Sequence, residues 1–285
     1  MFCDIVARRK HMFNPKKIKI DNLSLGDLDH EAELIPLLST EDEEEMNNES
    51  VPEEMPILPL RNMVLFPGVV IPITAGRDRS IKLLQEANAA NKVIGIVAQK
   101  DESIEEPGAD DLHKIGVVAR ILRILKMPDG NTTVIIQGKK RFQMGEILTE
   151  QPYITAKTTD IPEARPLPDN TEFNAIIDSI KELSLEIIKQ SPNIPSEASF
   201  AIKNIESNSF LVNFVSSNMN LKVSEKQQLL EMNDLKDRAL ETLRFMNIEQ
   251  QKLELKNDIQ SKVHSDINKQ QREYFLHQQM KTIQD

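Results

Sequence analysis

The sequence contains no tryptophan, a single cysteine and few aromatic residues, which make up 4% of the chain. The lone Cys3 excludes an internal disulfide bond. No apolar run approaches the roughly 18 residues that a membrane-spanning helix needs. No apolar segment follows the basic stretch Arg8–Lys10, which argues against a secretory signal. We therefore expect a soluble, cytoplasmic protein with no membrane partner, although the basic, acid-poor Met1–Ile20 leaves an organellar transit peptide as an alternative.

Sequence signatures of catalysis and of cofactor binding are also missing. There is no GxxxxGK[ST] phosphate-binding loop, no GxSxG or HExxH motif, and no cluster of cysteine and histidine. The basic cluster Lys139–Arg141 has no interleaved aromatic residues, which argues against nucleic-acid binding. The sequence thus predicts no catalytic residue, no metal site and no cofactor within these 285 residues.

Acidic residues are concentrated near the N-terminus. Eleven of them lie between Asp29 and Glu54 with no Lys or Arg among them, and the remainder of the chain is nearly neutral. Such a run is usually solvated and lacks a packed core. We predict a disordered acidic tail over residues 1–54, and a specific acidic docking motif is the alternative.

Glycine and proline divide the rest of the chain. The last glycine is Gly145 and the last proline is Pro195. Turns and bulges use both residues, whereas helix interiors exclude them. The distribution predicts an α+β protein with a small β-barrel-like domain over residues 55–162, a linker at 163–168, a helical bundle at 169–234 and a long projecting helix at 235–285.

Local patterns refine the β-rich part. Two β-branched segments, Ile57–Arg61 and Val69–Thr74, flank a turn at Phe66–Gly68. Pro59 and Pro72 lie inside these segments and predict strand edges or bulges, because proline cannot donate to a ladder. A second pair of apolar runs, 112–126 and 132–145, surrounds a Pro-Asp-Gly-Asn turn and predicts a hairpin. Helical spacing over residues 79–91 predicts a helix with Asp78 as its N-cap.

The C-terminal segment 235–285 has neither glycine nor proline. As one helix it would be about 75 Å long at 1.5 Å per residue. Its apolar stripe is narrow in the second half, so the helix is not buried in its own domain and is expected to project, to pair with a partner through an assembly surface, or both. A generic surface helix is the alternative. The residues predicted to form this assembly surface are Leu253, Leu255, Ile259, Val263 and Ile267.

The stretch Met55–Ser80 resembles the opening of the N-terminal domain of Lon, the ATP-dependent serine protease. The family pattern is matched by Pro56, Leu58-Pro59-Leu60-Arg61, Val64, Phe66-Pro67-Gly68, Pro72, Gly76-Arg77 and Ser80. The resemblance continues through Ile115–Ala119 and Lys126–Gly130 and is strong again at Gln271–Leu276. Asn62 departs from the pattern, because an acid is common at that position.

The resemblance implies the substrate-recognition and hexamer-assembly region of a cytoplasmic protease that degrades misfolded, damaged and short-lived regulatory proteins. It implies unfolded or damaged proteins and further copies of the chain as partners. The family's ATP- and Mg²⁺-binding residues and its Ser-Lys dyad have no counterpart here. We therefore expect an N-terminal fragment that continues toward an ATPase module.

Capture of unfolded chains requires exposed apolar surface with adaptable side chains. We predict that this surface lies near the first strands. The predicted apolar contacts are Met63, Leu65, Phe66 and Val69. The predicted charged rim is Arg77, Asp78 and Arg79. Ordinary core packing is the alternative role for Phe66 and Val69, and helix capping or solvation is the alternative for the rim.

Two other functions fit parts of the sequence. A stand-alone binding module with no enzyme attached would use the same β-rich domain. A coiled-coil scaffold would account only for the last helix and would leave the β-rich domain without a role.

Overall fold

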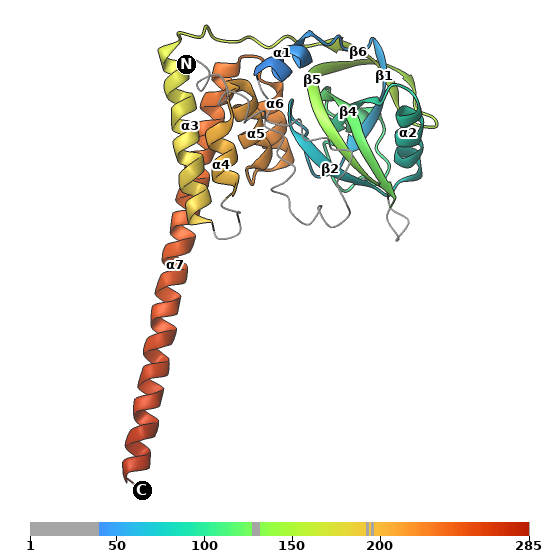
Figure 1. The fold of residues 1–285 in the computed structure, drawn as a ribbon. Coiled ribbons are helices and arrows are strands. Elements are labelled where there is room, and N and C mark those ends of the chain that lie inside the picture. The colour runs from blue at the N-terminus through green and yellow to red at the C-terminus, as the bar shows by residue number, and fades with distance from the viewer. Residues whose placement is uncertain (1–39, 127–131, 192–193, 195–196, 285) are drawn as a thin grey trace, which may run out of the picture. The chain divides into compact units, whose positions relative to one another are not determined.

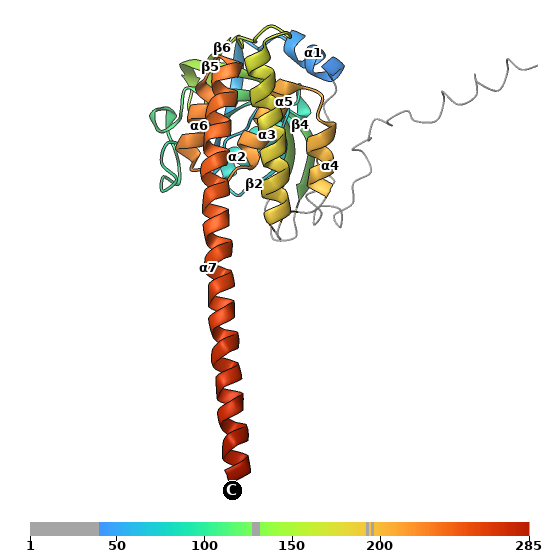
Figure 2. The same ribbon diagram turned by 90° about the vertical axis from the view of Figure 1, so that its left-hand side faces the viewer.

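The structure is a computed structural model that describes residues 40–126, 132–191, 194 and 197–284. All of these residues belong to one compact unit, residues 35–285. A β-sheet domain comes first and a group of helices follows, ending in a helix that continues well beyond the others (Figures 1 and 2). The predicted α+β class with a long final helix is confirmed.

Six strands form the sheet, in the order β2-β5-β4-β3-β1-β6. Their bounds are Glu54–Leu60 (β1), Val70–Ala75 (β2), Val93–Ala98 (β3), Ile115–Lys126 (β4), Thr132–Thr149 (β5) and Thr155–Asp160 (β6). The long strand β5 also pairs with β6, which closes β5, β4, β3, β1 and β6 into a ring. This closure confirms the barrel-like expectation.

The predicted hairpin is confirmed, because β4 and β5 pair antiparallel from Ile115↔Gln143 to Lys126↔Thr132. The expected turn at 127–131 lies outside the described residues. Pro72 lies in β2, which pairs only with β5 and is an edge strand. Pro59 has a strand partner on one side, since β1 pairs with β3 over Ile57–Leu60 but with β6 only over Glu54–Pro56. Both prolines therefore lie where no ladder donor is needed.

The turn at Phe66–Gly68 packs directly on β5. Gly68 has a φ of 80°, a left-handed conformation that glycine adopts without strain. Its N–H donates to the Gly138 carbonyl at 3.0 Å, and the Gly138 N–H donates to the Val69 carbonyl at 2.9 Å. A Cβ on Gly138 would lie 2.3 Å from the Phe66 carbonyl oxygen. Glycine at 138 is what allows the opening stretch to approach the barrel this closely.

Helices α3 to α7 lie in the half of the chain that the sequence predicts to be helical, and α1 and α2 come before that half. Their bounds are Thr40–Asn48 (α1), Asp78–Ala89 (α2), Thr171–Gln190 (α3), Glu197–Asn204 (α4), Asn208–Asn218 (α5), Val223–Glu231 (α6) and Leu235–Gln284 (α7), with a short 3-10 turn at Ala109–Asp111 (η4). Asn170 caps α3, because its side-chain oxygen accepts from the Phe173 N–H at 2.9 Å. Helix α2 begins at Asp78 itself, so the prediction that Asp78 is the N-cap is wrong. No helix among the described residues is long and apolar enough to cross a membrane.

Helices α3 and α7 run side by side in the same direction (Figure 2). Polar contacts join them near both ends of α3, between Glu172 and Lys236 and between Glu186 and Gln250. The large hydrophobic core continues from the barrel strands into these helices, from Leu58 in β1 to Met246 in α7. A smaller cluster, which includes Ile57 and Phe142, belongs to the barrel.

The predicted disordered tail over residues 1–54 is wrong for its last part. Residues 40–48 form α1, and β1 already begins at Glu54. Two α1 side chains are buried, Glu43 at 7% and Met46 at 4% exposed. The acidic composition hid a helix with one inward face, since positions three apart lie on the same side. The rest of the predicted tail, residues 1–39, lies outside the described residues.

We expect Gly138→Ala to destabilise the protein by about 2 kcal/mol, because the new methyl group would overlap backbone held by hydrogen bonds. The change would appear as a lower urea midpoint. Gly108→Ala is the matched control, since an added Cβ there lies 3.7 Å from its nearest neighbour. An unchanged midpoint for Gly138→Ala would contradict the close approach of the turn to β5.

Candidate functional site

A cleft of about 620 Å³ opens beside the first strands of the barrel. Its walls come from the ends of β1 and β2, the first turn of α2, the loop that carries Glu105 and Glu106, and the segment before β6. Buried Leu58, Leu60, Ile73 and Leu83 contribute apolar surface to it. The cleft therefore combines an apolar lining with strand edges that have no neighbour.

Charged groups of both signs surround this cleft. The cations are Arg61, Arg77 and Arg79, and the anions are Asp78, Glu105, Glu106 and Glu150. Arg79 Nη2 lies 3.4 Å from Glu106 Oε2. Burial lowers the pKa of Arg77, and the neighbouring positive charge of Arg61 lowers it further. A rim of mixed charge does not select one sign of ligand.

The buried Gln99 organises the loop side of the cleft. It is 1% exposed, and its side-chain oxygen accepts from Arg77 Nη2 at 3.0 Å. Its amide nitrogen donates to the Ile104 carbonyl at 3.0 Å, and Arg61 Nη2 donates to the same carbonyl at 3.4 Å. In the segment before β6, the Tyr153 hydroxyl donates to Glu86 at 2.5 Å, and this hydrogen bond raises the pKa of Tyr153.

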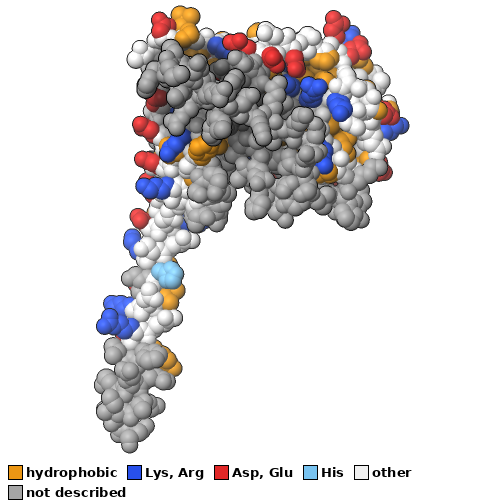
Figure 3. Space-filling view, in the orientation of Figure 1, with side chains coloured by type: hydrophobic (Ala, Val, Ile, Leu, Met, Phe, Trp, Pro, Cys, Tyr) orange, Lys and Arg blue, Asp and Glu red, His pale blue; other side chains and the backbone are white. Residues whose placement is uncertain are grey.

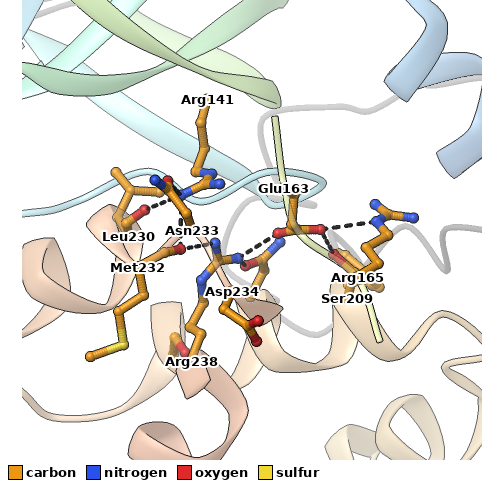
Figure 4. Close-up of polar contacts among 12 residues, drawn as sticks. Arg141, Glu163, Arg165, Ser209, Leu230, Met232, Asn233, Asp234 and Arg238 are labelled. Atoms are coloured by element: carbon orange, nitrogen blue, oxygen red, sulfur yellow. Dashed lines mark hydrogen bonds and ion pairs between the residues drawn. The ribbon is translucent and has the colours of Figure 1, made fainter. Parts of the chain in front are cut away.

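A second arrangement of charges lies where the barrel meets the helices (Figure 4). We call it the junction network, and it consists of Arg141, Glu163, Arg165, Ser209 and Arg238. Arg238 Nη1 lies 2.8 Å from Glu163 Oε1, while Arg165 Nε and Ser209 Oγ each lie 3.1 Å from Glu163 Oε2. One carboxylate thus joins α7, α5 and the connector between β6 and α3.

Arg141 anchors β5 to the other side of the same network. Its Nη1 donates to the carbonyls of Leu230 and Met232 at 3.0 and 2.8 Å, and to the Asn233 side chain at 3.2 Å. Burial, followed by the positive charge of Arg238, lowers the pKa of Arg141 to about 10. The guanidinium therefore stays charged at neutral pH, and its partners at the α6–α7 turn are mainly carbonyl groups.

Burial and the neighbouring positive charges shift the pKa of Glu163 in opposite directions. Burial raises its pKa, but the positive charges of Arg238, Arg165 and Arg141, with the hydrogen bond from Arg238, outweigh burial and lower the pKa overall. The predicted linker at 163–168 is thus tied into the protein, and Ala164 also exchanges backbone hydrogen bonds of 3.0 Å with Asn233 and Leu235. No group of three or more His, Cys, Asp or Glu suited to a metal ion occurs among the described residues.

Residues 54–248 match the family model described as the ATP-dependent protease La (LON) substrate-binding domain. This match covers more than half of the 285 residues. The chain belongs to this Lon family. The match includes the cleft and the junction network, and it begins at the first residue of β1.

Relatives named Lon protease agree with this assignment. The chain is 69% identical over 274 residues to Lon protease of Flavobacterium johnsoniae, covering 96% of this chain and 34% of the relative. It is 47% identical over 254 residues to Lon protease of Cytophaga hutchinsonii, covering 89% of this chain and 31% of the relative. The chain therefore spans about a third of the length of these curated relatives.

A solved structure supports the fold of the Lon domain. The N-terminal domain of a Mycobacterium avium complex Lon protease aligns with a TM-score of 0.57 at 22% identity. The alignment covers 68% of this chain and 98% of that one.

The predicted contact residues of the Lon domain divide into three groups. Arg77, Asp78 and Arg79 line the cleft, and the capping alternative fails for Arg77, which makes no side-chain cap hydrogen bond. The expectation of an open apolar surface is wrong for three residues, Leu65, Phe66 and Val69, which are 2%, 0% and 5% exposed in the core. The sequence placed Phe66 in a turn and Val69 at the start of a strand, but only tertiary packing decides which side of such a segment is covered. Met63 is 38% exposed and lies outside the cleft lining.

Sequence reasoning missed other residues of both sites. Arg61 stands in the quoted Leu58–Arg61 motif and could have been assigned to the rim from that motif. Nothing in the local sequence distinguishes Glu163, Arg238 or Tyr153 from ordinary surface residues. The predicted assembly residues lie on α7, where Leu255, Ile259, Val263 and Ile267 are 61%, 53%, 52% and 45% exposed. Leu253 is half-buried.

We expect Glu163→Gln to lower the free energy of unfolding at neutral pH by about 3–5 kcal/mol, because it leaves the buried Arg238 without its carboxylate. The lowered pKa of Glu163 means that its contribution is present above the unfolded value near 4.5 and is lost as pH falls through the folded value. The difference between the variant and the unaltered chain should therefore shrink in acid.

Urea unfolding across a pH series measures this effect. Glu172→Gln is the matched control, since Glu172 pairs with Lys236 at the surface with its side chain 69% exposed. That change should cost less than about 1 kcal/mol. Equal, small losses for both variants would show that the junction network contributes little to stability.

Proposed function

We propose that this chain is the substrate-recognition and assembly region of an ATP-dependent Lon-type protease that degrades misfolded, damaged and short-lived regulatory proteins. The observation that supports this most directly is the match of residues 54–248 to the Lon substrate-binding domain. In this proposal the partners are unfolded protein substrates and five further copies of the chain, and the complex works in the cytoplasm.

The cleft beside β1 and β2 is the proposed place of substrate contact. Its apolar lining suits hydrophobic side chains of an unfolded client, and its mixed rim tolerates flanking residues of either charge. Pro59 and Pro72 lie in the two strands whose edges are unpaired there. Proline disfavours the pairing of an added strand with such an edge. A client would therefore be held by side-chain contacts, which give broad specificity and low affinity.

Low affinity at one cleft is compatible with retention of a client by an assembly. When several weak sites are linked, later contacts form at a high effective concentration, and the combined affinity exceeds that of one site by orders of magnitude. This requires that copies of the chain hold their clefts within reach of one unfolded polypeptide.

The exposed row on α7 is the proposed assembly contact. Figure 3 shows hydrophobic side chains along one side of the lower part of α7 and basic side chains on the other. Leu255, Ile259, Val263 and Ile267 are four residues apart and form a single ridge. Two ridges of this kind interdigitate at a crossing angle of about −50°. The row thus suits crossing contacts between α7 helices of neighbouring subunits.

Proteolysis and ATP hydrolysis belong, in this proposal, to parts of the protein outside these 285 residues. The chain carries no GxxxxGK[ST] sequence that could bind ATP and Mg²⁺, and no residues are assigned to a catalytic dyad. The alternative, a stand-alone binding module, predicts the same cleft without an attached enzyme. Sequencing the gene beyond the codon for Asp285 separates the two, because only the protease predicts a phosphate-binding loop downstream.

We expect the chain to bind a permanently unfolded model protein and to bind its native form at least about tenfold more weakly, a difference of 1.4 kcal/mol. Ser80→Trp should remove most of this binding, because Ser80 lines the cleft and a tryptophan would fill it. Fluorescence anisotropy of the labelled client measures both. Gln85→Trp, exposed on the same helix outside the lining, is the matched control. Equal binding of native and unfolded client would sink the proposal.

Self-association through α7 should depend on the hydrophobic row. We expect Ile259→Asp to reduce the association constant at least about tenfold, because a charge would enter the centre of the contact. Sedimentation velocity over a concentration series measures it, with the exposed Ser261→Asp as the control off the row. The assembly role fails if the unaltered chain and both variants sediment as the same monomer at every concentration.

A further inference from the structure

Helix α1 has one buried face between exposed acids. Glu43 and Met46, three residues apart, are 7% and 4% exposed, whereas Glu44 and Glu45 are exposed. A helix of nine residues is marginal in water by itself, since isolated helices shorter than about 12–15 residues rarely hold. The surface beneath α1 must therefore supply much of its stability.

That surface is a groove between the barrel and the helices, and its ion pairs match the acids of α1. Glu43 Oε1 lies 2.6 Å from Arg165 Nη2, and the other carboxylate oxygen accepts from the Ser207 hydroxyl. Just after α1, Glu49 Oε1 lies 3.6 Å from Lys139 Nζ. Lys140 Nζ donates to the Glu49 backbone carbonyl at 3.4 Å.

Between these polar contacts, Met46 enters the large core cluster. The groove thus binds an acid, an apolar residue and a second acid that follow one another at spacings of three, namely Glu43, Met46 and Glu49. Its apolar centre lies between two cationic ends. A cavity of about 520 Å³ still lies between α1, β5, the connector and α5, so α1 does not fill the groove. In Figure 3, acidic side chains at the position of α1 adjoin a group of basic side chains.

Helix α1 lies outside the residues that match the Lon domain, which begin at 54, whereas Lys139, Lys140 and Arg165 lie inside them. The cationic side of the groove therefore lies within the matched residues, and its occupant α1 lies before them. Only Glu49–Glu53 tethers α1 to β1. This short tether, in which the Glu53 carbonyl accepts from the Thr158 N–H at 2.8 Å, gives an internal ligand a high effective concentration, which a competing partner must exceed in affinity.

We propose that the groove formed by Lys139, Lys140, Arg165 and Ser207 is a docking site for an acidic amphipathic helix of a partner protein, and that α1 occupies it as an internal competitor. The partner helix carries an acid, an apolar residue and a second acid at positions i, i+3 and i+6. This site is separate from the cleft beside β1 and β2 and does not depend on the proposed substrate recognition.

Exchange of the occupant would also act on the junction network. Arg165 pairs with Glu43 of α1 and, at 3.1 Å, with Glu163. Lys139 and Lys140 belong to β5, whereas Ser207 caps α5. An occupant therefore bridges the barrel and the helices, and a partner that replaces α1 would take over that bridge.

The test uses the 285-residue chain and a fluorescent peptide with the sequence of residues 40–51. Met46→Asp in the chain should release α1, and the peptide should then bind at least about tenfold more tightly than to the unaltered chain, whose tethered α1 competes. Arg165→Gln added to Met46→Asp should weaken binding several-fold, and binding should fall as salt rises. Circular dichroism checks that each variant is folded.

Two further arms keep the test decisive. A peptide of scrambled order has the same charge but lacks the spacing, and it should not bind. Glu43→Gln with Glu49→Gln in the chain releases α1 by a second route that leaves the apolar centre of the groove unchanged, and it covers the case in which Met46→Asp fails to fold. Absence of peptide binding to both released chains, or equal binding of the scrambled peptide, would overturn the proposal.

Discussion

Two arginines buried at one junction constrain the whole described part of the chain. Arg141 and Arg238 are 3% and 0% exposed, and a buried charge without partners costs several kcal/mol. Arg141 requires the carbonyls of the α6–α7 turn, and Arg238 requires the carboxylate of Glu163. The barrel, the connector and α7 therefore cannot separate without leaving a guanidinium unpaired, which makes their arrangement a condition of stability.

Strand β5 connects the buried Arg141 to the stretch Met55–Ser80. Gly138, which receives the Phe66–Gly68 turn, lies three residues before Arg141 on the same strand. The turn fixes where β2 starts, and β2 with the end of β1 forms the walls of the cleft. The residues that define the family pattern thus act mainly in building the cleft. Phe66 is buried in the core, whereas charged neighbours such as Arg61 and Arg77 line the cleft.

The sequence was informative where a local pattern has one structural solution. The loss of glycine after Gly145, the apolar runs around residues 127–131 and the uninterrupted segment from Leu235 each specified an element that the structure contains. It failed where the outcome depends on distant partners. Glu163 looks like a linker residue until Arg238, 75 positions later, lies beside it. Glu43 and Met46 look like tail until Arg165 and the core cover them, because burial is decided by the surface opposite and not by composition.

Helix α7 connects these local constraints to assembly. Arg238 ties its first turns to the connector that follows β6, and Ile259 in the exposed row follows 21 residues later, about 30 Å along an unbroken helix at 1.5 Å per residue. A contact between two α7 rows would fix the crossing angle of the helices. Since the junction network fixes each barrel to its own α7, the same angle would also fix the directions in which the clefts face. Pairing far from the barrel would then determine whether two clefts can reach one unfolded chain. Helix α1, or a partner helix that replaces it, would act on the junction between each barrel and its own helices.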